Sequence, residues 1–210
     1  FDLLECAGLT VSELKEAIAN AIEVFNGSGR LCFAFSNHDV PRSASRQLSP
    51  LGITLDKQDD LQLLLLQLET SLIGSSCIYQ GEELGLSDVT NIQFDKMKDP
   101  WGLNFYPEFL GRDTCRTPMV WEKNKPMGGF TSANEAWLPI SELHMEKAGL
   151  DMAKSEGSIY NKFSSFLKWR RKQPAMISSN KMSELFGGPS EIIFDRESET
   201  QILRCKFDFE

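Results

Sequence analysis

The chain of 210 residues carries 22 Lys and Arg against 30 Asp and Glu, which gives a formal net charge of -8 at pH 7. A chain of this length can bury a sizeable hydrophobic core and suits one or two domains. The acidic balance argues against nucleic acid or an anionic membrane as a partner, because both require a basic surface.

Cysteine and histidine are sparse and scattered. The five cysteines stand at positions 6, 32, 77, 115 and 205 without a Cys-x-x-Cys pair, and the only histidines are His38 and His144. This usage predicts reduced core cysteines in a cytoplasmic protein and no metal site. The most apolar run, Leu61 to Leu68, is far shorter than a membrane span. Because the first residue is Phe1, the chain is expected to be a fragment, and a targeting signal would lie outside it.

The hydrophobic pattern of residues 1–83 predicts strands that alternate with helices. The expected strands are Phe1–Leu4, Leu31–Phe35 and Ser75–Tyr79, and the expected helices are about Val11–Phe25 and Lys57–Ile73. Thr10 and Glu13 form a capping box in front of the first helix. Two consecutive crossover units of this kind imply parallel strands with helices packed outside them.

The second half of the chain follows a different pattern. Residues 84–157 are rich in Pro, Gly, Asp and Trp without a sustained period, which predicts an ordered loop excursion, since disordered segments are poor in aromatic residues. A helix is expected at Ser158–Lys172, ended by Pro174. Alternation at Glu191–Phe194 and Gln201–Phe209 predicts an antiparallel hairpin with one wet face.

Polar residues that could do chemistry follow the strand Leu31–Phe35 directly. Asn37, His38 and Asp39 lie at its carboxyl end, which is where sheet and barrel enzymes place their working residues. The four residues Ser36–Asp39 also suit a simple turn, because each bonds readily to nearby backbone.

Three motifs together resemble glycoside hydrolase family 13, the α-amylase and α-glucosidase family. They are Phe35–Arg42 (FSNHDVPR), Ile78–Gly85 (IYQGEELG) and Gly111–Trp121 (GRDTCRTPMVW), the last followed by Gly129-Phe130 and Trp137-Leu138-Pro139. The third motif is similar to the α-glucosidase and oligo-1,6-glucosidase branch.

The resemblance implies an α/β fold: a partial TIM (β/α)8 barrel, strands six to eight, followed by the start of an antiparallel β-sandwich C-terminal domain. Residues 1–176 would form the barrel part, with the excursion at about 84–157. Residues 177–210 would begin the β domain.

The resemblance also implies an exo-acting, retaining α-glucosidase that acts on α-linked gluco-oligosaccharides without a cofactor. Asp39 matches the carboxylate that stabilises the transition state, His38 a residue that binds the same sugar, and Arg116 the arginine that closes the pocket. The nucleophile and the acid/base of the family follow its fourth and fifth strands, so neither is expected in this chain, which alone would be inactive.

Other polar residues receive structural interpretations. Arg42, Arg46 and Arg116 are expected to keep Asp39 ionised. Arg112 is expected to pair locally with Asp113, and Glu82 and Glu83 to order the turn at Gly81. Trp101, Trp121 and Trp137 could stack on sugar faces but are expected to pack beneath the loop. His144 is expected to lie on the surface. Tyr79 and Gln80 remain ambiguous.

Two alternatives stay open. Trehalose synthases, sucrose isomerases and transglucosylases use the same scaffold and differ in how the site excludes water. A non-catalytic transporter heavy-chain ectodomain would have an upstream membrane span and would lose the site residues. The oligomeric state is left undetermined by the sequence.

Overall fold

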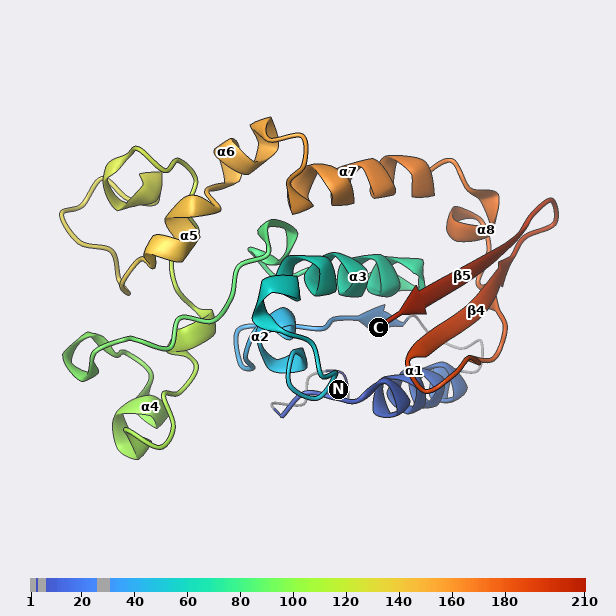
Figure 1. Cartoon of the computed structure of the whole chain (residues 1–210), viewed down its shortest axis with the longest axis horizontal. Helices are drawn as coiled ribbons and strands as arrows, with labels where there is room; N and C mark the ends of the chain where they lie inside the picture. Colours follow the sequence, from blue (N-terminus) through green and yellow to red (C-terminus); the bar gives the residue numbers. More distant parts are fainter. Residues whose placement is uncertain (1–2, 4–6, 26–30) are drawn as a thin grey trace.

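The computed structural model describes Leu3, residues 7–25 and residues 31–210. The centre of the molecule is a short parallel strand pair with α3 above it and α1 below it, and α7 lies over α3 (Figure 1). A two-stranded hairpin closes one end, and the excursion with α4 and α5 extends from the other.

The first helix, α1 (Val11–Phe25), confirms the prediction. The Thr10 backbone N–H donates to the Glu13 carboxylate at 2.7 Å, and the Glu13 N–H donates to the Thr10 hydroxyl at 3.3 Å, so the capping box satisfies two N–H groups that the helix leaves open. Leu14, Ala17 and Ile18 bury its apolar face. The predicted strand Phe1–Leu4 lies outside the described residues, Leu3 apart.

The two central strands, β1 (Cys32–Phe33) and β2 (Ser75–Ser76), pair in parallel as predicted. The helix between them is α3 (Gln58–Ser71), preceded by the 3-10 turn η2 (Leu55–Lys57). Both strands are shorter than predicted, because side-chain carboxyl groups take backbone donors that a longer ladder would use. Phe35 N–H donates to Glu69 at 3.3 Å, and Tyr79 N–H donates to Glu82 at 2.9 Å.

One face of this strand pair is covered and the other is open. Phe33 and Phe35 are buried in the main core together with residues of α1 and α3. On the open face, the side chains of Cys32, Ser75 and Cys77 are exposed. Parallel sheets in proteins are normally covered on both faces.

The loop after β1 contains a short helix that the sequence pattern does not predict, α2 (Ser43–Gln47). A second tight turn follows β2, where Gly81 has φ 87 and a Cβ atom would lie 2.6 Å from Leu86. Only glycine adopts this conformation at low cost, so the chain can turn directly into η3 (Glu82–Leu84).

The excursion is ordered, as predicted, and its helices in the described chain are short. They are η4 (Phe94–Lys96), α4 (Pro100–Phe105), η5 (Asp113–Cys115), η6 (Pro126–Gly129), α5 (Glu142–Glu146) and α6 (Gly149–Lys154). Backbone bonds between distant segments hold it, for example from Val89 N–H to the Thr114 carbonyl at 3.0 Å.

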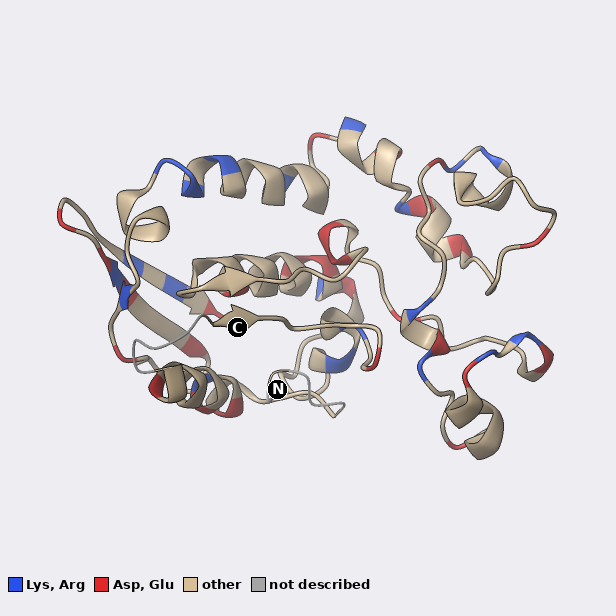
Figure 2. Ribbon diagram, turned by 180° about the vertical axis from the view of Figure 1, so that it is seen from behind, with Lys and Arg blue, Asp and Glu red and all other residues tan. Residues whose placement is uncertain are grey.

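The helix α7 (Ile159–Arg170) confirms the prediction, with Ser158 as its N-cap accepting the Asn161 N–H at 3.2 Å. Basic residues mark its last turn (Figure 2). Pro174 ends this segment and opens a further short helix, α8 (Pro174–Ile177).

The C-terminal hairpin, β4 (Glu191–Glu197) and β5 (Ile202–Asp208), is antiparallel as predicted, with β3 (Lys181–Met182) as an unpredicted third strand. β4 extends past Phe194 because Asp195 pairs with Arg204 on β5. Its inner face shares one core with α1 and α3. The division at residues 176 and 177 stays a prediction.

A buried arginine ties the hairpin to the helical layer. Arg196 of β4 is 1% exposed and donates from Nη1 to the carbonyls of Ser71 and Leu72, at 2.6 and 2.8 Å, and from Nη2 to Ser179 at 2.8 Å. The Ser71 and Leu72 carbonyls lie at and just after the C-terminal end of α3, where backbone acceptors lack helical partners.

We predict that Arg196→Met lowers the free energy of unfolding of the chain by about 2–4 kcal/mol, because it leaves buried carbonyl groups without a hydrogen-bond donor. Arg204→Met is the control, since Arg204 pairs with Asp195 on the exposed side of the same hairpin and exposed pairs contribute little. Urea unfolding of both variants measures the difference, and equal losses would contradict this role.

Candidate active site

The structure brings the three predicted site residues together. Arg116 Nη2 lies 2.8 Å from the Asp39 carboxylate, and Arg116 Nε donates to the His38 carbonyl at 2.6 Å. The His38 imidazole lies 3.4 Å from the other Asp39 oxygen. The predicted proximity is therefore confirmed, whereas the roles of the three residues in sugar binding stay predictions.

The turn that carries Asp39 is built locally. The side-chain oxygen of Asn37 accepts the Asp39 N–H at 2.7 Å, which is the Asx type of turn that the Ser36–Asp39 pattern also allows. Val40 is buried behind the turn, while Asp39 stays half exposed, with 49% of its side chain accessible. The turn thus presents a carboxylate at the carboxyl end of a parallel strand.

Arg112 does not pair with Asp113, so that interpretation is wrong. Arg112 Nη2 and Nε bind the Asp99 carboxylate at 2.8 and 3.1 Å, while Nη1 donates to Asp39 at 3.0 Å. Asp113 instead accepts the backbone N–H groups of Lys98 and Asp99. The buried Asp99 therefore fixes the guanidinium so that one free edge faces Asp39.

The local sequence offers little sign of this arrangement. Asp99 lies outside the third motif, 13 residues before Arg112, and a pair at that separation has no helical or strand spacing. Trp101 lies over the other side of the same guanidinium, with 4.9 Å from the ring centroid to the guanidinium carbon. Sequence reasoning missed both residues as neighbours of the site.

Two arginines on one carboxylate set its charge. Partial burial alone would raise the pKa of Asp39, but Arg112, His38 and Arg116 outweigh that effect and hold the pKa below its usual value. For Asp99, the side-chain hydrogen bond from Arg112 is the largest influence and lowers the pKa to about 2, against the effect of burial. Both carboxylates are thus ionised at neutral pH.

The cations that lower the pKa of Asp39 are Arg112, His38 and Arg116, so the expectation that Arg42 and Arg46 do so is wrong. Arg42 is 1% exposed and donates to the carbonyls of Gln80 and Cys115. Arg46 is buried and donates to the carbonyls of Leu3, Pro41 and Phe35. Both are structural cations that hold backbone segments together around the turn.

The glutamates after β2 have the structural surroundings expected of them. Glu83 accepts the N–H of Gly81 at 2.8 Å and so orders the turn. Glu82 is buried and accepts hydrogen bonds from residues of the segments that follow both strands, β1 and β2. Tyr79 donates its hydroxyl to the Cys115 carbonyl at 3.2 Å, which gives it a structural contact as well.

The prediction that His144 lies on the surface is wrong, because the residue is only 1% exposed. Its Nε2 lies 2.8 Å from the Ser87 carbonyl and therefore carries the proton in that bond. Burial lowers its pKa to about 4, so the imidazole is neutral at physiological pH. His144 joins α5 to the start of the excursion and takes no part in the Asp39 cluster.

Further expectations about single residues hold in part. Cys115 and Cys205 are buried as predicted, Cys32 and Cys77 are exposed, and Cys6 lies outside the described residues. Trp101, Trp121 and Trp137 are each about half exposed, so the prediction that they pack beneath the loop is wrong for this chain.

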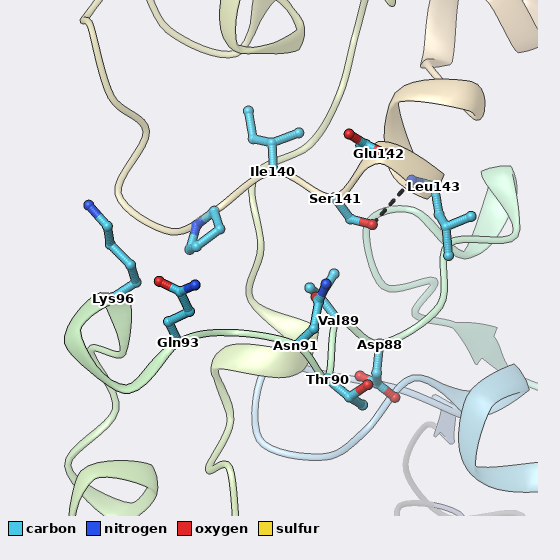
Figure 3. A pocket seen from close by; sticks show the side chains of 11 residues that line it. Asp88, Val89, Thr90, Asn91, Gln93, Lys96, Ile140, Ser141, Glu142 and Leu143 are labelled. Carbon is cyan, nitrogen blue, oxygen red and sulfur yellow. Dashed lines mark hydrogen bonds between the residues drawn. The ribbon is translucent and has the colours of Figure 1, made fainter.

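A cavity of about 750 Å³ lies elsewhere, between residues 88–96 and 139–143 (Figure 3). Its lining includes Asp88, Asn91 and Glu142 but not His38, Asp39 or Arg116. The cluster of His38, Asp39 and Arg116 lies instead at the surface, where the side chains of His38 and Asp39 are 68% and 49% exposed, and is called the rim below. Within the described part of the chain, groups of three or more His, Cys, Asp or Glu that could hold a metal ion are absent.

The described helices include none that is long and apolar enough to span a membrane.

Comparison with known proteins identifies the fold. A solved alpha-glucosyl transfer enzyme superposes on 100% of this chain and 37% of its own with a TM-score of 0.86 and 32% identity. An isomaltulose synthase from Erwinia rhapontici covers 96% of this chain and 38% of its own, with a TM-score of 0.81 and 21% identity. The architecture is thus that of the α-amylase-type TIM barrel, with a small three-stranded antiparallel sheet.

Sequence comparison gives the family. The profile "Alpha amylase, catalytic domain" matches residues 3–179, and the chain therefore belongs to the α-amylase family, glycoside hydrolase family 13. A probable alpha-glucosidase of Rhizobium meliloti is 45% identical over 148 residues, 70% of this chain and 26% of that protein. An oligo-1,6-glucosidase of Halalkalibacterium halodurans is 25% identical over 217 residues, 95% of this chain and 38% of that protein. The chain thus spans between a quarter and two-fifths of these relatives.

We predict that Arg112→Met raises the pKa of Asp99 from about 2 to its ordinary value of about 3.9 or above, because a buried carboxylate loses its cation. In the parent chain the pair stabilises the fold fully above about pH 4, and this contribution is lost as the pH falls through about 2.

Carboxyl carbon NMR of both variants as a function of pH measures this shift. Arg171→Met serves as the control, since Arg171 lies at the end of α7 and makes no contact with Asp99. An Asp99 pKa that stays near 2 in Arg112→Met would show that the guanidinium is not its cause.

Proposed function

We propose that this chain is part of a retaining α-glucosidase that removes glucose from α-linked oligosaccharides. The observation that carries the proposal is the ionised Asp39 at the carboxyl end of β1, held by Arg112 and Arg116. A fixed carboxylate there can accept hydrogen bonds from sugar hydroxyls, and such bonds strengthen as positive charge develops on the ring in the transition state.

The nucleophile and the acid/base carboxylates lie outside this chain in our proposal. A retaining mechanism needs two carboxyl groups about 5–5.5 Å apart on either side of the scissile bond. The carboxylate next to Asp39 in the described chain, Asp99, is buried and bound by Arg112, so it is a poor candidate for either role.

We further propose that β1 and β2 are the seventh and eighth strands of the barrel. The open face of the strand pair, with Cys32, Ser75 and Cys77 exposed, supports this assignment, because parallel strands need cover on both faces. The remaining strands of a longer protein would supply that cover, and with it the missing carboxylates. A cytoplasmic location is part of the same proposal and rests on the unpaired cysteine pattern.

Exo-action follows from Arg116 in this proposal. Its side chain is only 21% accessible and binds both the Asp39 carboxylate and the His38 carbonyl. An aspartate from another part of the protein could pair with the same guanidinium and close one end of the site. A pocket with a closed end accepts a chain terminus and releases one glucose at a time.

Transfer of glucose to an acceptor sugar is the second candidate. It is favoured by the 32% identical solved structure, which is named for alpha-glucosyl transfer. Hydrolysis and transfer share the glycosyl-enzyme step and differ in whether water or a sugar attacks it. The presence together of Asp39, His38 and Arg116 in one cluster favours either enzyme over a non-catalytic transporter ectodomain.

The full-length protein is expected to release glucose from nitrophenyl α-glucoside and maltose, and the 210-residue chain alone is expected to be inactive. Asp39→Asn in the full-length protein should lower kcat/KM roughly 100-fold or more, since hydrogen bonds of this kind supply several kcal/mol to the transition state. Product analysis on maltose and sucrose separates hydrolysis from transfer. An inactive full-length protein, or an unaffected Asp39→Asn variant, would contradict the proposal.

The barrel assignment has its own test. Cys32 and Cys77 should react with a thiol reagent in the 210-residue chain and be protected in the folded full-length protein, because the other strands would cover them. The buried Cys205 is the internal control and should react slowly in both. Mass spectrometry of labelled peptides measures the rates, and equal labelling of Cys32 and Cys77 in both proteins would contradict a closed barrel.

A further inference from the structure

A buried carboxylate lies beneath the turn that carries Asp39. Glu82, in the 3-10 turn after β2, is 1% exposed and accepts three hydrogen bonds. Its Oε1 accepts the hydroxyls of Ser36 and Ser43, both at 2.7 Å, and its Oε2 accepts the Tyr79 N–H at 2.9 Å. Three donors from two neighbouring strand ends thus converge on one side chain.

The two serines bracket the turn. Ser36 precedes Asn37, His38 and Asp39, and Ser43 begins α2 on the far side of Pro41. The Ser43 N–H also donates to the Ser36 hydroxyl at 2.7 Å, so the two ends of the segment 36–43 are joined directly as well as through Glu82. The loop that presents Asp39 is therefore closed at its base.

The hydroxyl of Ser43 has a single proton to donate. The Glu82 oxygen at 2.7 Å is a nearer acceptor than the amide oxygen of Gln62 at 3.1 Å, and bonds to carboxylates are the stronger kind. A second buried carboxyl, Glu69, accepts the Phe35 N–H at 3.3 Å and has no described bond to these three donors. Burial first, and then the nearby Glu82, raise the pKa of Glu69 to about 9, so it is protonated at neutral pH.

We infer that Glu82 is a positioning residue for Asp39: it fixes segment 36–43 to the end of β2 so that the Asp39 carboxylate is already oriented before substrate binds. This inference rests on the proposed function, because it gives Asp39 its proposed role. Asp39 itself is half exposed, and its two arginine partners, which are held by Asp99 and the His38 carbonyl, bind it only where the turn places its carboxylate. A misplacement of about 1 Å at a reacting centre can cost roughly 100-fold in rate.

Glutamate suits this position better than its amide. The carboxylate offers acceptors to all three donors, whereas glutamine turns an NH2 group either toward the Tyr79 N–H or toward the two hydroxyls. One buried donor then loses its partner and the base of the turn shifts.

The test is a double-mutant cycle in the full-length protein with nitrophenyl α-glucoside. Glu82→Gln is expected to lower kcat about 10- to 100-fold with a smaller change in KM. Combined with Asp39→Asn, it should add little further loss, because the group it positions is already removed. A merely structural role would lower Tm and reduce activity by the same factor in both backgrounds.

The matched control is Glu83→Gln. Glu83 is the adjacent carboxylate, accepts the Gly81 N–H within its own turn and has no described bond to segment 36–43. Its effect on kcat should therefore be small and should multiply independently with that of Asp39→Asn.

Full additivity of Glu82→Gln and Asp39→Asn, or an unchanged kcat in Glu82→Gln, would overturn the inference. If Glu82→Gln does not fold, Ser43→Ala replaces it in the same cycle, with the same expectation of coupling to Asp39→Asn. Failure of the proposed function has a different signature, since the full-length protein is then inactive or indifferent to Asp39→Asn.

Discussion

The buried guanidinium of Arg42 holds together the segments that build the site. It donates to Gln80 at the end of β2 and to Cys115 in the excursion, and it lies over the Tyr79 ring with 5.1 Å to the centroid. The backbone N–H of Arg42 donates to the carboxylate of Asp88, at the start of the excursion, at 3.0 Å. A cation buried at this depth needs acceptors, and the two carbonyl oxygens supply them. Without it, the excursion would lose one of its attachments to the strand ends.

Attachment of the excursion matters because it supplies the cations for Asp39. Arg112 and Arg116 are more than 70 residues away from Asp39 along the chain, yet both guanidinium groups reach one carboxylate oxygen. Asp99 prevents Arg112 from turning away, and the His38 carbonyl does the same for Arg116. The charge of the rim therefore depends on two parts of the chain. The turn after β1 supplies the Asp39 carboxylate, and a long loop without extended helices of its own supplies the two guanidinium groups.

Several elements could be predicted from local patterns. Helix α1 follows from its capping box and apolar spacing, α7 from its period and Ser158, and the hairpin from alternation, because each signal lies within the element itself. Strand lengths could not be predicted, since Glu69 and Glu82 take donors at the strand ends from other parts of the chain. The burial of His144 was equally invisible, because its partner Ser87 is 57 residues away.

By itself, the sequence determined the family, the alternation of strands and helices, and the three residues that form the rim, because these are carried by short motifs with their own residue chemistry. Only the tertiary structure decided which arginines act on Asp39. Arg42 and Arg46, close in sequence, turn inward to backbone carbonyls, whereas Arg112 is held on Asp39 by the distant Asp99. The effect of an arginine on Asp39 depends on the distance between them in space, and the fold of a long loop sets that distance.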